Sequence, residues 1–325
     1  MRLFPTLLLL LPLCLVGQNP HRLGLLEQPD TLHPQRLRLS IIGGSVIYGA
    51  AAVGLYHTWY KDFELGKFRT FNDSGEWLQM DKLGHLLTTY QEARLLYDGA
   101  RWTGLDKKRS RWLAGGISMF LQATVEVMDG FSEKWGFSWS DVGFNTLGMG
   151  TFVLQQRIWE EQRIIFKLSS NQDWPSAAPI SSTNGLAHSS LRARSAELYG
   201  TSLAERALKD YNTMSIWASV NVRSFFPDAP WPAWLNVAVG HGAANLYGGF
   251  SNTWTDAEGN SYRIPPGELR RHRQYYLSFD VDLKRIPTRH RGVRTLLSVL
   301  NFIKIPAPTL EWNREAGFRG HWLYY

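Results

Sequence analysis

The first half of the chain is patterned for helices. Apolar residues recur every three to four positions in four segments, which predicts amphipathic helices. The segments are residues 38–60, 76–97, 107–128 and 138–163. Ser138 followed by Asp141 has the spacing of a helix N-cap motif, with Asp in place of the usual Glu. Four helices in succession predict a bundle over residues 38–165.

The pattern changes after residues 169–190, a polar stretch with prolines that predicts a linker. Beyond it, apolar and polar residues alternate, as in strands that bury one face. The predicted strands lie around 216–223, 234–239, 275–283 and 301–311. We therefore predict an α+β protein, in which a four-helix bundle is followed by an antiparallel, strand-rich region over residues 205–325. Tyr324 and Tyr325 resemble the ends of outer-membrane strands, but the strands are too few for a whole barrel.

The N-terminus has the features of a secretory signal. Arg2 precedes an apolar run and Gly17 offers a small residue for cleavage, so we predict a signal peptide over residues 1–17. Lipoprotein processing is disfavoured, because Leu13 rather than a small residue precedes Cys14. Since Cys14 is the only cysteine, the cleaved chain would have no thiol chemistry, disulfide or zinc–thiolate site. The expected location is the periplasm, in association with the cell envelope, with the outer membrane as one candidate.

Charge and aromatic content favour a membrane partner. The net charge is +7, and basic side chains are concentrated at residues 263–294. An exported protein is not expected to meet nucleic acid, so the expected partner is a membrane surface or another anionic envelope lipid or glycan. A solvated basic loop is the alternative. Fourteen tryptophans and 13 tyrosines favour either a large aromatic core or aromatic belts at a membrane interface.

One internal apolar run, residues 41–56, approaches the length of a membrane span. The next runs, 112–125 and 142–154, are shorter and suit buried helices. Peripheral or partial membrane contact is therefore favoured over a multi-pass topology. Whether residues 41–56 cross a bilayer is left open by the sequence.

Polar side chains form a stripe on each of three predicted helices. Their spacing of three or four residues places each set on one helix face. The sets are Asp81, His85, Thr88 and Glu92; Ser118, Gln122, Glu126 and Asp129; and Asp141, Asn145 and Gly148. Because the other positions are largely apolar, the three stripes are expected to meet inside the bundle. The predicted pocket consists of Asp81, Lys82, His85, Glu92, Gln122, Glu126, Asp129, Asp141 and Asn145.

Buried carboxylates require a partner, a proton or a cation. His85, Glu126, Asp129 and Asp141 could therefore bind a divalent metal ion as a cofactor, whereas His85, Glu126 and Asp141 could instead act as general acid and base. Three further interpretations stay open. One is a structural network in which Lys82 neutralises a carboxylate and His85 donates to Glu126. Another is that Asp141 merely stabilises the N-terminus of its helix. The third is a pocket for an anionic ligand. A di-iron centre is excluded, because a di-iron bundle needs a Glu-x-x-His pair and the sequence contains none.

These motifs resemble the YfiM-like family, a domain of unknown function in predicted periplasmic or lipoprotein-type sequences of bacteria. The resemblance rests on DKLGH at 81–85, EVMDG at 126–130 and SWSDVGFNTLG at 138–148. The second half is similar to a longer form typical of Bacteroidetes, through KDYN at 209–212, WLNVAVGHG at 234–242, DVDLKRI at 280–286 and IKIPAPTLEWN at 303–313. The helical half also resembles VanZ-like membrane proteins, through Asp81, Lys82, His85, Glu126, Asp141 and Asn145. The signal peptide and the strand-rich half depart from the VanZ-like pattern, and the YfiM-like resemblance implies no established activity.

The sequence lacks the glycine patterns of nucleotide-binding proteins and the nucleophile elbow of serine hydrolases. We interpret the chain as an exported, membrane-associated envelope protein, with a structural role or with a bundle pocket that binds a lipid or glycan. The alternative is a metal-assisted hydrolase that acts on an envelope lipid or a peptidoglycan precursor. Whether the chain is an enzyme, and its oligomeric state, are left open.

Overall fold

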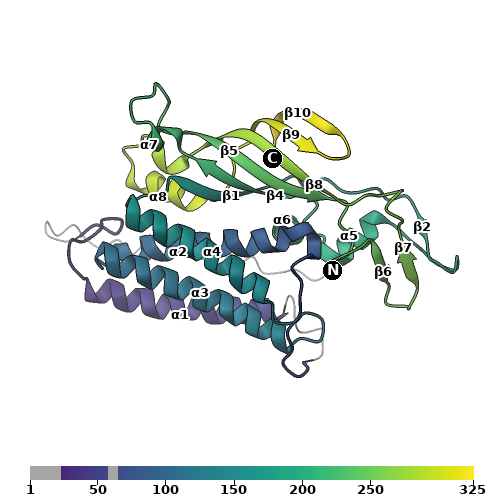
Figure 1. Cartoon of the computed structure of the whole chain (residues 1–325). Helices are drawn as coiled ribbons and strands as arrows, with labels where there is room; N and C mark the ends of the chain where they lie inside the picture. The colour runs from purple at the N-terminus through teal and green to yellow at the C-terminus, as the bar shows by residue number, and fades with distance from the viewer. Residues whose placement is uncertain (1–22, 58–64) are drawn as a thin grey trace.

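The computed structural model describes residues 23–57 and 65–325, so the predicted signal peptide lies outside the described residues. A layer of helices lies against a curled antiparallel sheet (Figure 1). The first-half helices are α1 (Pro34–Leu55), η2 (Glu76–Gln79), α2 (Met80–Trp102), α3 (Lys107–Phe131) and α4 (Trp139–Ile158). Helices in the first half and an antiparallel sheet in the second confirm the predicted α+β class.

The helix ends follow from local sequence. The side chains of Asp106 and Ser138 accept backbone hydrogen bonds at the starts of α3 and α4, as N-caps do. The chain instead enters α2 through three successive residues with positive φ: Trp77, Leu78 and Gln79. The α2 and α3 helices run past their predicted ends to Trp102 and Phe131, whereas α4 ends at Ile158, before its predicted end at 163.

The sheet has six antiparallel strands in the order β1-β4-β5-β8-β9-β10. They are β1 (Ile164–Ser170), β4 (Met214–Val220), β5 (Leu235–Ala244), β8 (His272–Val281), β9 (Ala307–Asn313) and β10 (Gly317–Tyr324). The structure has strands near the four segments where alternation predicted them. It adds β10, and it adds β1, which begins after the predicted helix end at 163 and runs into the predicted linker that starts at 169.

Short elements connect these strands. They are β2 (Ile180–Ser181), β3 (His188–Ser189), α5 (Leu191–Tyr199), α6 (Leu203–Lys209), α7 (Val222–Phe225), β6 (Thr253–Thr255), β7 (Ser261–Arg263), η3 (Leu283–Arg285) and α8 (Arg291–Leu300). The stretch 169–190 therefore contains the end of β1 and the hairpin β2–β3. The predicted strand at 301–311 lies later, as β9.

The apolar core lies between the two layers, where α2 and α4 face β1 and β4. The ring of Tyr90 on α2 lies 5.2 Å from that of Phe166 on β1, edge to face. Further along α2, Leu87 packs in one cluster with Ile216 of β4. Gly148 lets α4 approach α2 closely, because a Cβ there would lie 2.3 Å from the backbone oxygen of Leu86.

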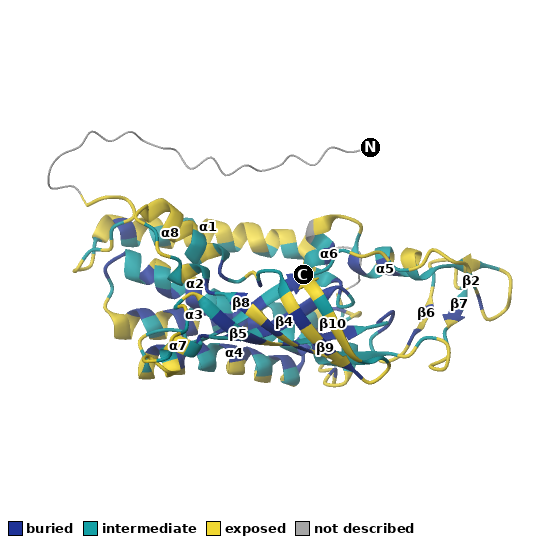
Figure 2. Ribbon diagram, turned by 90° about the horizontal axis from the view of Figure 1, so that it is seen from above, coloured by how far each residue is buried: buried dark blue, intermediate teal, exposed yellow. Residues whose placement is uncertain are grey.

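Away from the helices, the sheet buries its polar face. Along β8, Leu277 and Phe279 are exposed whereas Ser278 and Asp280 are buried. The alternation of exposed and buried residues continues across β9, whereas β10 is exposed or half-buried throughout (Figure 2). The sequence pattern predicted one buried face for this strand, and the buried face is the polar one. We call the outward surface of β5, β8, β9 and β10 the apolar sheet face; its large side chains, 42–84% exposed, are Val239, Tyr275, Leu277, Phe279, Leu310, Trp312, Phe318 and Trp322.

The buried face of the sheet is held by charged and hydroxyl groups. The ammonium of Lys167 on β1 lies 2.8 Å from Asp280 Oδ2 on β8, and both side chains are fully buried. Ser219 on β4 donates to the same carboxylate at 2.6 Å. Such an interior is stable only where each charge has a partner. Polar pairing therefore shares the concave side of the sheet with a buried aromatic cluster that includes Trp217 and Tyr276.

Candidate functional site

Lys82 is the centre of the polar cluster in the bundle. Its side chain is 1% exposed, and its ammonium lies 2.7 Å from Asp73, 2.9 Å from Asp81 and 2.6 Å from Asp141. These carboxylates come from the segment before η2, from α2 and from the first turn of α4. Burial alone would lower the pKa of Lys82, but Asp81 and Asp141 outweigh it and raise that pKa. The ammonium therefore stays charged and joins the three chain segments.

Asp73 belongs to this cluster although it lies on none of the three predicted polar stripes. Its Oδ1 accepts hydrogen bonds from the hydroxyls of Ser138 at 2.6 Å and Ser140 at 2.7 Å. Burial opposes ionisation of Asp73, but hydrogen bonds from Lys82 and the two serines lower its pKa to about 2. Asp73 is thus an anion that fixes the start of α4. The Asn-Asp-Ser-Gly sequence gave no signal for this contact.

Tyr211 links the cluster to the second half of the chain. Its hydroxyl donates to Asp81 Oδ1 at 2.8 Å, across 130 residues of sequence. Burial opposes ionisation of Asp81, but the charges of His85 and Lys82 outweigh it and lower its pKa. The sequence analysis missed Tyr211, since KDYN carries no chemical motif that would have indicated it.

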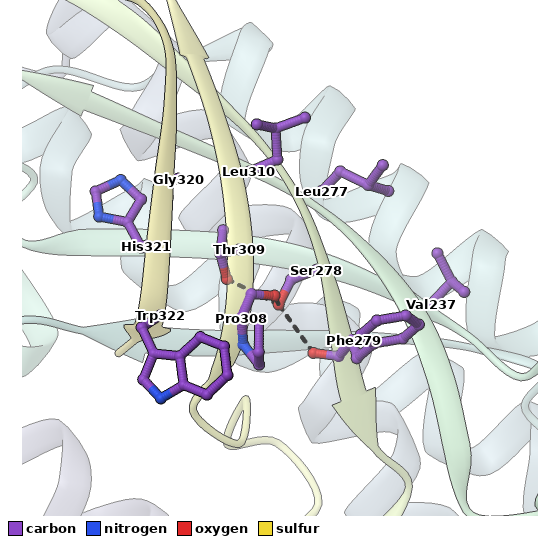
Figure 3. A pocket seen from close by; sticks show the side chains of 10 residues that line it. All are labelled: Val237, Leu277, Ser278, Phe279, Pro308, Thr309, Leu310, Gly320, His321 and Trp322. Atoms are coloured by element: carbon purple, nitrogen blue, oxygen red, sulfur yellow. Dashed lines mark hydrogen bonds between the residues drawn. The ribbon is translucent and has the colours of Figure 1, made fainter.

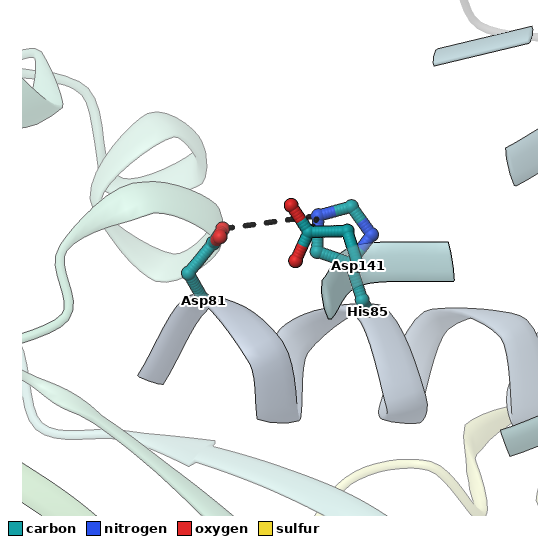
Figure 4. Close-up of side chains that lie close together, drawn as sticks. All are labelled: Asp81, His85 and Asp141. Carbon is teal, nitrogen blue, oxygen red and sulfur yellow. Dashed lines mark ion pairs between the residues drawn. The ribbon is translucent and has the colours of Figure 1, made fainter. Parts of the chain in front are cut away.

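His85 lies among three carboxylates. Its Nε2 is 3.7 Å from Asp141 Oδ1 and 3.9 Å from Asp81 Oδ1, and Figure 4 shows these three side chains converging. On the other side of the ring, Nδ1 lies 3.2 Å from Asn145 Oδ1 and 3.6 Å from Glu126 Oε1. Burial lowers the pKa of His85, but the charges of Asp81, Asp141 and Glu126 outweigh it and raise that pKa.

Glu126 is the most deeply buried carboxylate of the cluster, at 0% exposure. Its Oε2 accepts the backbone N–H of Ser138 at 3.3 Å, whereas its Oε1 has no hydrogen-bond partner among the described residues. Burial raises its pKa to about 8, and burial raises the pKa of Asp141 to about 6. Perturbed carboxylates of this kind gather at functional sites and in structural ion-pair networks alike.

The predicted polar stripes are brought together only in part. Gln122 donates to Glu92 Oε1 at 3.0 Å, which makes a second polar pair further along α2. Thr88 is exposed, and Thr89 takes its place by donating to Asn145 Oδ1 at 2.8 Å. Asp129 is half-buried, and its charge helps to raise the pKa of Glu126.

The predicted metal ligands are distributed differently from the expectation. Among the described residues, the group whose ligand atoms lie within 4.8 Å of one another consists of Asp81, His85 and Asp141. This group therefore includes Asp81, which was not among the predicted metal ligands, and it lacks Glu126 and Asp129, which were. His85 reaches Glu126 and Asp141 within 3.7 Å, but the side chains of these two carboxylates are only 1% and 6% exposed. The residues converge as an acid–base site would, in surroundings almost closed to solvent, and catalysis by them stays a prediction.

Glu92, further along α2 from the cluster, provides a test of how burial affects a carboxyl group. Burial raises the pKa of Glu92 to about 7, from 4.5. The folded protein therefore holds a proton that the unfolded chain releases, so Glu92 lowers folded-state stability as pH rises from about 4.5 to 7. Glu92→Gln keeps the contact with Gln122. The unfolding free energy of the variant minus that of wild type should increase by roughly 2–3 kcal/mol from pH 5 to pH 8. Thermal unfolding at both pH values measures this, with the exposed Glu258→Gln as control; an equal difference at both pH values would contradict the prediction.

The fold and the site define an α+β protein. A carboxylate-rich polar cluster lies among its helices, and its sheet is inverted, with apolar side chains exposed and polar ones buried on β8 and β9. Residues 70–157, which hold this cluster, match a family model described as a predicted periplasmic lipoprotein of unknown function, DUF2279. The match covers less than half of the chain. It supports an uncharacterised family of periplasmic or lipoprotein type, and an exported, periplasmic protein. No curated protein and no solved structure matches the chain.

Proposed function

We propose that the protein is an envelope component with a structural role, held at a membrane by the apolar sheet face. The observation that supports this most strongly is the inverted sheet, in which Leu277 and Phe279 are exposed while Ser278 and Asp280 are buried. In water an apolar surface of this size is costly, and such patches mark interaction sites. The proposal refines the exported envelope protein that the family match supports.

The order of side chains on this face fits lipid. Tyr275 pairs with Trp312 across β8 and β9, with ring centroids 5.7 Å apart. The next outward pair is aliphatic, Leu277 with Leu310, and Phe279 follows it on β8. Aliphatic side chains flanked by aromatic rings are typical of strands that face a bilayer, since rings prefer the headgroup region.

A groove runs through the apolar sheet face (Figure 3). It is lined largely by apolar side chains, among them Leu277, Phe279, Pro308, Leu310 and Trp322. Among these lining residues the polar Ser278 and Thr309 bond to each other at 2.8 Å. The groove therefore offers few polar groups to a ligand and suits an acyl chain.

Two further elements favour a bilayer over a protein partner. Within the described residues, α1 is the one helix long and apolar enough to cross a membrane, and it is almost wholly exposed. The α8 helix exposes Val293, Leu296 and Val299 in a stripe beside Arg291 and Arg294, the pattern of helices that lie in a membrane interface. Both elements thus expose apolar side chains of the kind that contact lipid.

The basic segment 263–294 supports this proposal less than its charge suggested. Arg285 already contacts Glu161 at 2.8 Å and Asp282 at 3.2 Å. Arg291 pairs with Glu27. Apolar contact, rather than the net charge of the segment, is therefore the main term in the proposed membrane binding. A lipid or glycan ligand inside the bundle stays a prediction.

The experiment places an environment-sensitive fluorophore on the apolar sheet face. In a Cys14→Ser background, Leu277→Cys and Leu186→Cys each carry one label; Leu186 is 84% exposed on the β2–β3 loop and serves as the matched control. With vesicles of phosphatidylethanolamine and phosphatidylglycerol, the label at 277 should shift to the blue and be quenched by brominated lipid. The label at 186 should do neither. A vesicle-bound protein whose 277 label stays in water would overturn the proposal, since α1 alone would then account for binding.

A further inference from the structure

The side chains of Asp81, His85 and Asp141 present three electron-rich atoms to one small space. Their nearest ligand atoms lie 3.7 and 3.9 Å from His85 Nε2, and all three lie within 4.8 Å of one another. Atoms bound to one metal ion at about 2.1 Å lie roughly 3.4 Å apart in tetrahedral geometry. Small side-chain movements would therefore bring the three atoms to coordinating distance.

A hydrogen bond at Nδ1, the ring nitrogen away from Asp81 and Asp141, orients the ring of His85 for this role. Asn145 Oδ1 lies 3.2 Å from Nδ1, and an amide oxygen can only accept, so Nδ1 carries the hydrogen. In the neutral ring, Nε2 then presents its lone pair to Asp81 and Asp141. Metal-binding histidines are held in the same way, by a hydrogen bond from the ring nitrogen that does not bind the metal.

A second, independent feature is an unpartnered carboxyl oxygen beside this space. Glu126 is wholly buried on α3, and its Oε1 has no hydrogen-bond partner among the described residues while lying 3.6 Å from the His85 ring. The carboxyl groups of Asp73, Asp81, Glu126 and Asp141 all lie around Lys82 and His85. A buried carboxyl oxygen without a partner is unfavourable unless a proton or a cation compensates it.

Lys82 already contacts part of this space. It lies against Oδ2 of Asp81, whereas Oδ1 is the Asp81 atom nearest His85. On Asp141 it contacts Oδ1, which is also the atom nearest His85, so an ion would share that oxygen with the ammonium. Tyr211 donates a hydrogen bond to Asp81 Oδ1. The side chains of His85 and Asp81 are 15% and 23% exposed.

We propose that Asp81, His85 and Asp141 bind one divalent transition-metal ion, with Glu126 close by as an additional anion. One imidazole and two carboxylates suit Mn²⁺ or Zn²⁺, whereas Ca²⁺ prefers six to eight oxygen ligands. The site adds a cofactor to the proposed envelope component and does not depend on its membrane binding.

The test uses the full chain in detergent, stripped with EDTA and titrated calorimetrically with Mn²⁺, Zn²⁺ or Ca²⁺. Wild type should bind one equivalent of Mn²⁺ or Zn²⁺, at least tenfold more tightly than Ca²⁺. His85→Gln and Asp141→Asn should each weaken that binding at least tenfold. The control is His321→Gln, because His321 forms another histidine–carboxylate pair, 2.7 Å from Glu311, and its loss should leave binding unchanged.

Two further readouts guard against a variant that does not fold. Co²⁺ added to wild type should give visible absorption bands from an imidazole–carboxylate site, and these bands should be absent in His85→Gln. The metal should raise the melting temperature of wild type and of His321→Gln, but not of His85→Gln. Absence of saturable binding to wild type, or full binding by folded His85→Gln, would overturn the site, whatever the vesicle experiment shows.

Discussion

Replacing Lys82 with methionine should destabilise the folded protein by about 3–5 kcal/mol, because it leaves carboxylates buried without their cation. The ammonium lies within 2.9 Å of Asp73, Asp81 and Asp141, and the side chain is 1% exposed. Methionine has a similar length, so the loss is of charge rather than of volume. Thermal unfolding followed by circular dichroism should show a large fall in melting temperature.

The control for this variant is Lys107→Met. Lys107 pairs with Glu160, but their side chains are 58% and 62% exposed. Exposed ion pairs contribute about 0–1 kcal/mol, so the melting temperature should hardly change. If Lys82→Met melted like Lys107→Met, the cluster could not be organised around the ammonium, and the three chain segments would need another link.

The helices could be predicted well because their apolar periodicity and caps are local. Ser138 caps α4 as its spacing indicated. The errors fall where tertiary contacts decide the outcome. Residues 164–170 follow the polar stretch 160–163, and they become β1 because β4, much later in the sequence, provides a partner strand. No local pattern reports such pairing, so this strand was not predicted and the helix end was placed at 163 instead of Ile158.

The candidate site could be predicted as far as helical spacing reaches. His85, Glu126, Asp141 and Asn145 lie close together, as their stripes implied. Asp73 and Tyr211 were missed, because neither lies on one of the three predicted polar stripes. Each reaches the cluster through tertiary folding, Asp73 from an irregular segment and Tyr211 from the start of the second half. Side chains of this kind leave no periodic signal.

Alternation along β8 predicted a strand but could not tell which face is buried. A period-two pattern places Leu277 and Ser278 on opposite faces of the strand, but it does not say which of the two faces is buried. The assumption that apolar residues point inward holds for a protein surrounded by water. The structure instead places a charged pair and Tyr276 inside, and Leu277 and Phe279 outside, on this part of the sheet. The contacts that each face makes in the folded chain, rather than the sequence pattern, decide the orientation.

The polar interior of the sheet should be as sensitive as the bundle cluster. Asp280 accepts from Ser219 at 2.6 Å and from the backbone N–H of Ile305 at 3.0 Å, and it pairs with Lys167 at 2.8 Å. Asp280→Ala removes the anion and leaves the Lys167 ammonium fully buried, so we expect a loss of about 3–5 kcal/mol in unfolding free energy. Thermal unfolding in detergent measures it, with the exposed Asp228→Ala as control.

A double variant separates pairing from packing. Lys167→Met combined with Asp280→Leu removes both charges and fills the space with apolar atoms, so it should be more stable than Asp280→Ala alone. A double variant less stable than the single one would show that the remaining polar contacts of Asp280, rather than the ion pair, hold the strands. Because β1 carries Lys167 and also packs on α2, loss of the pair should loosen the contact between the two layers. The apolar sheet face would then lose its rigid support, and with it the ordered aromatic and aliphatic rows that the proposed lipid contact requires.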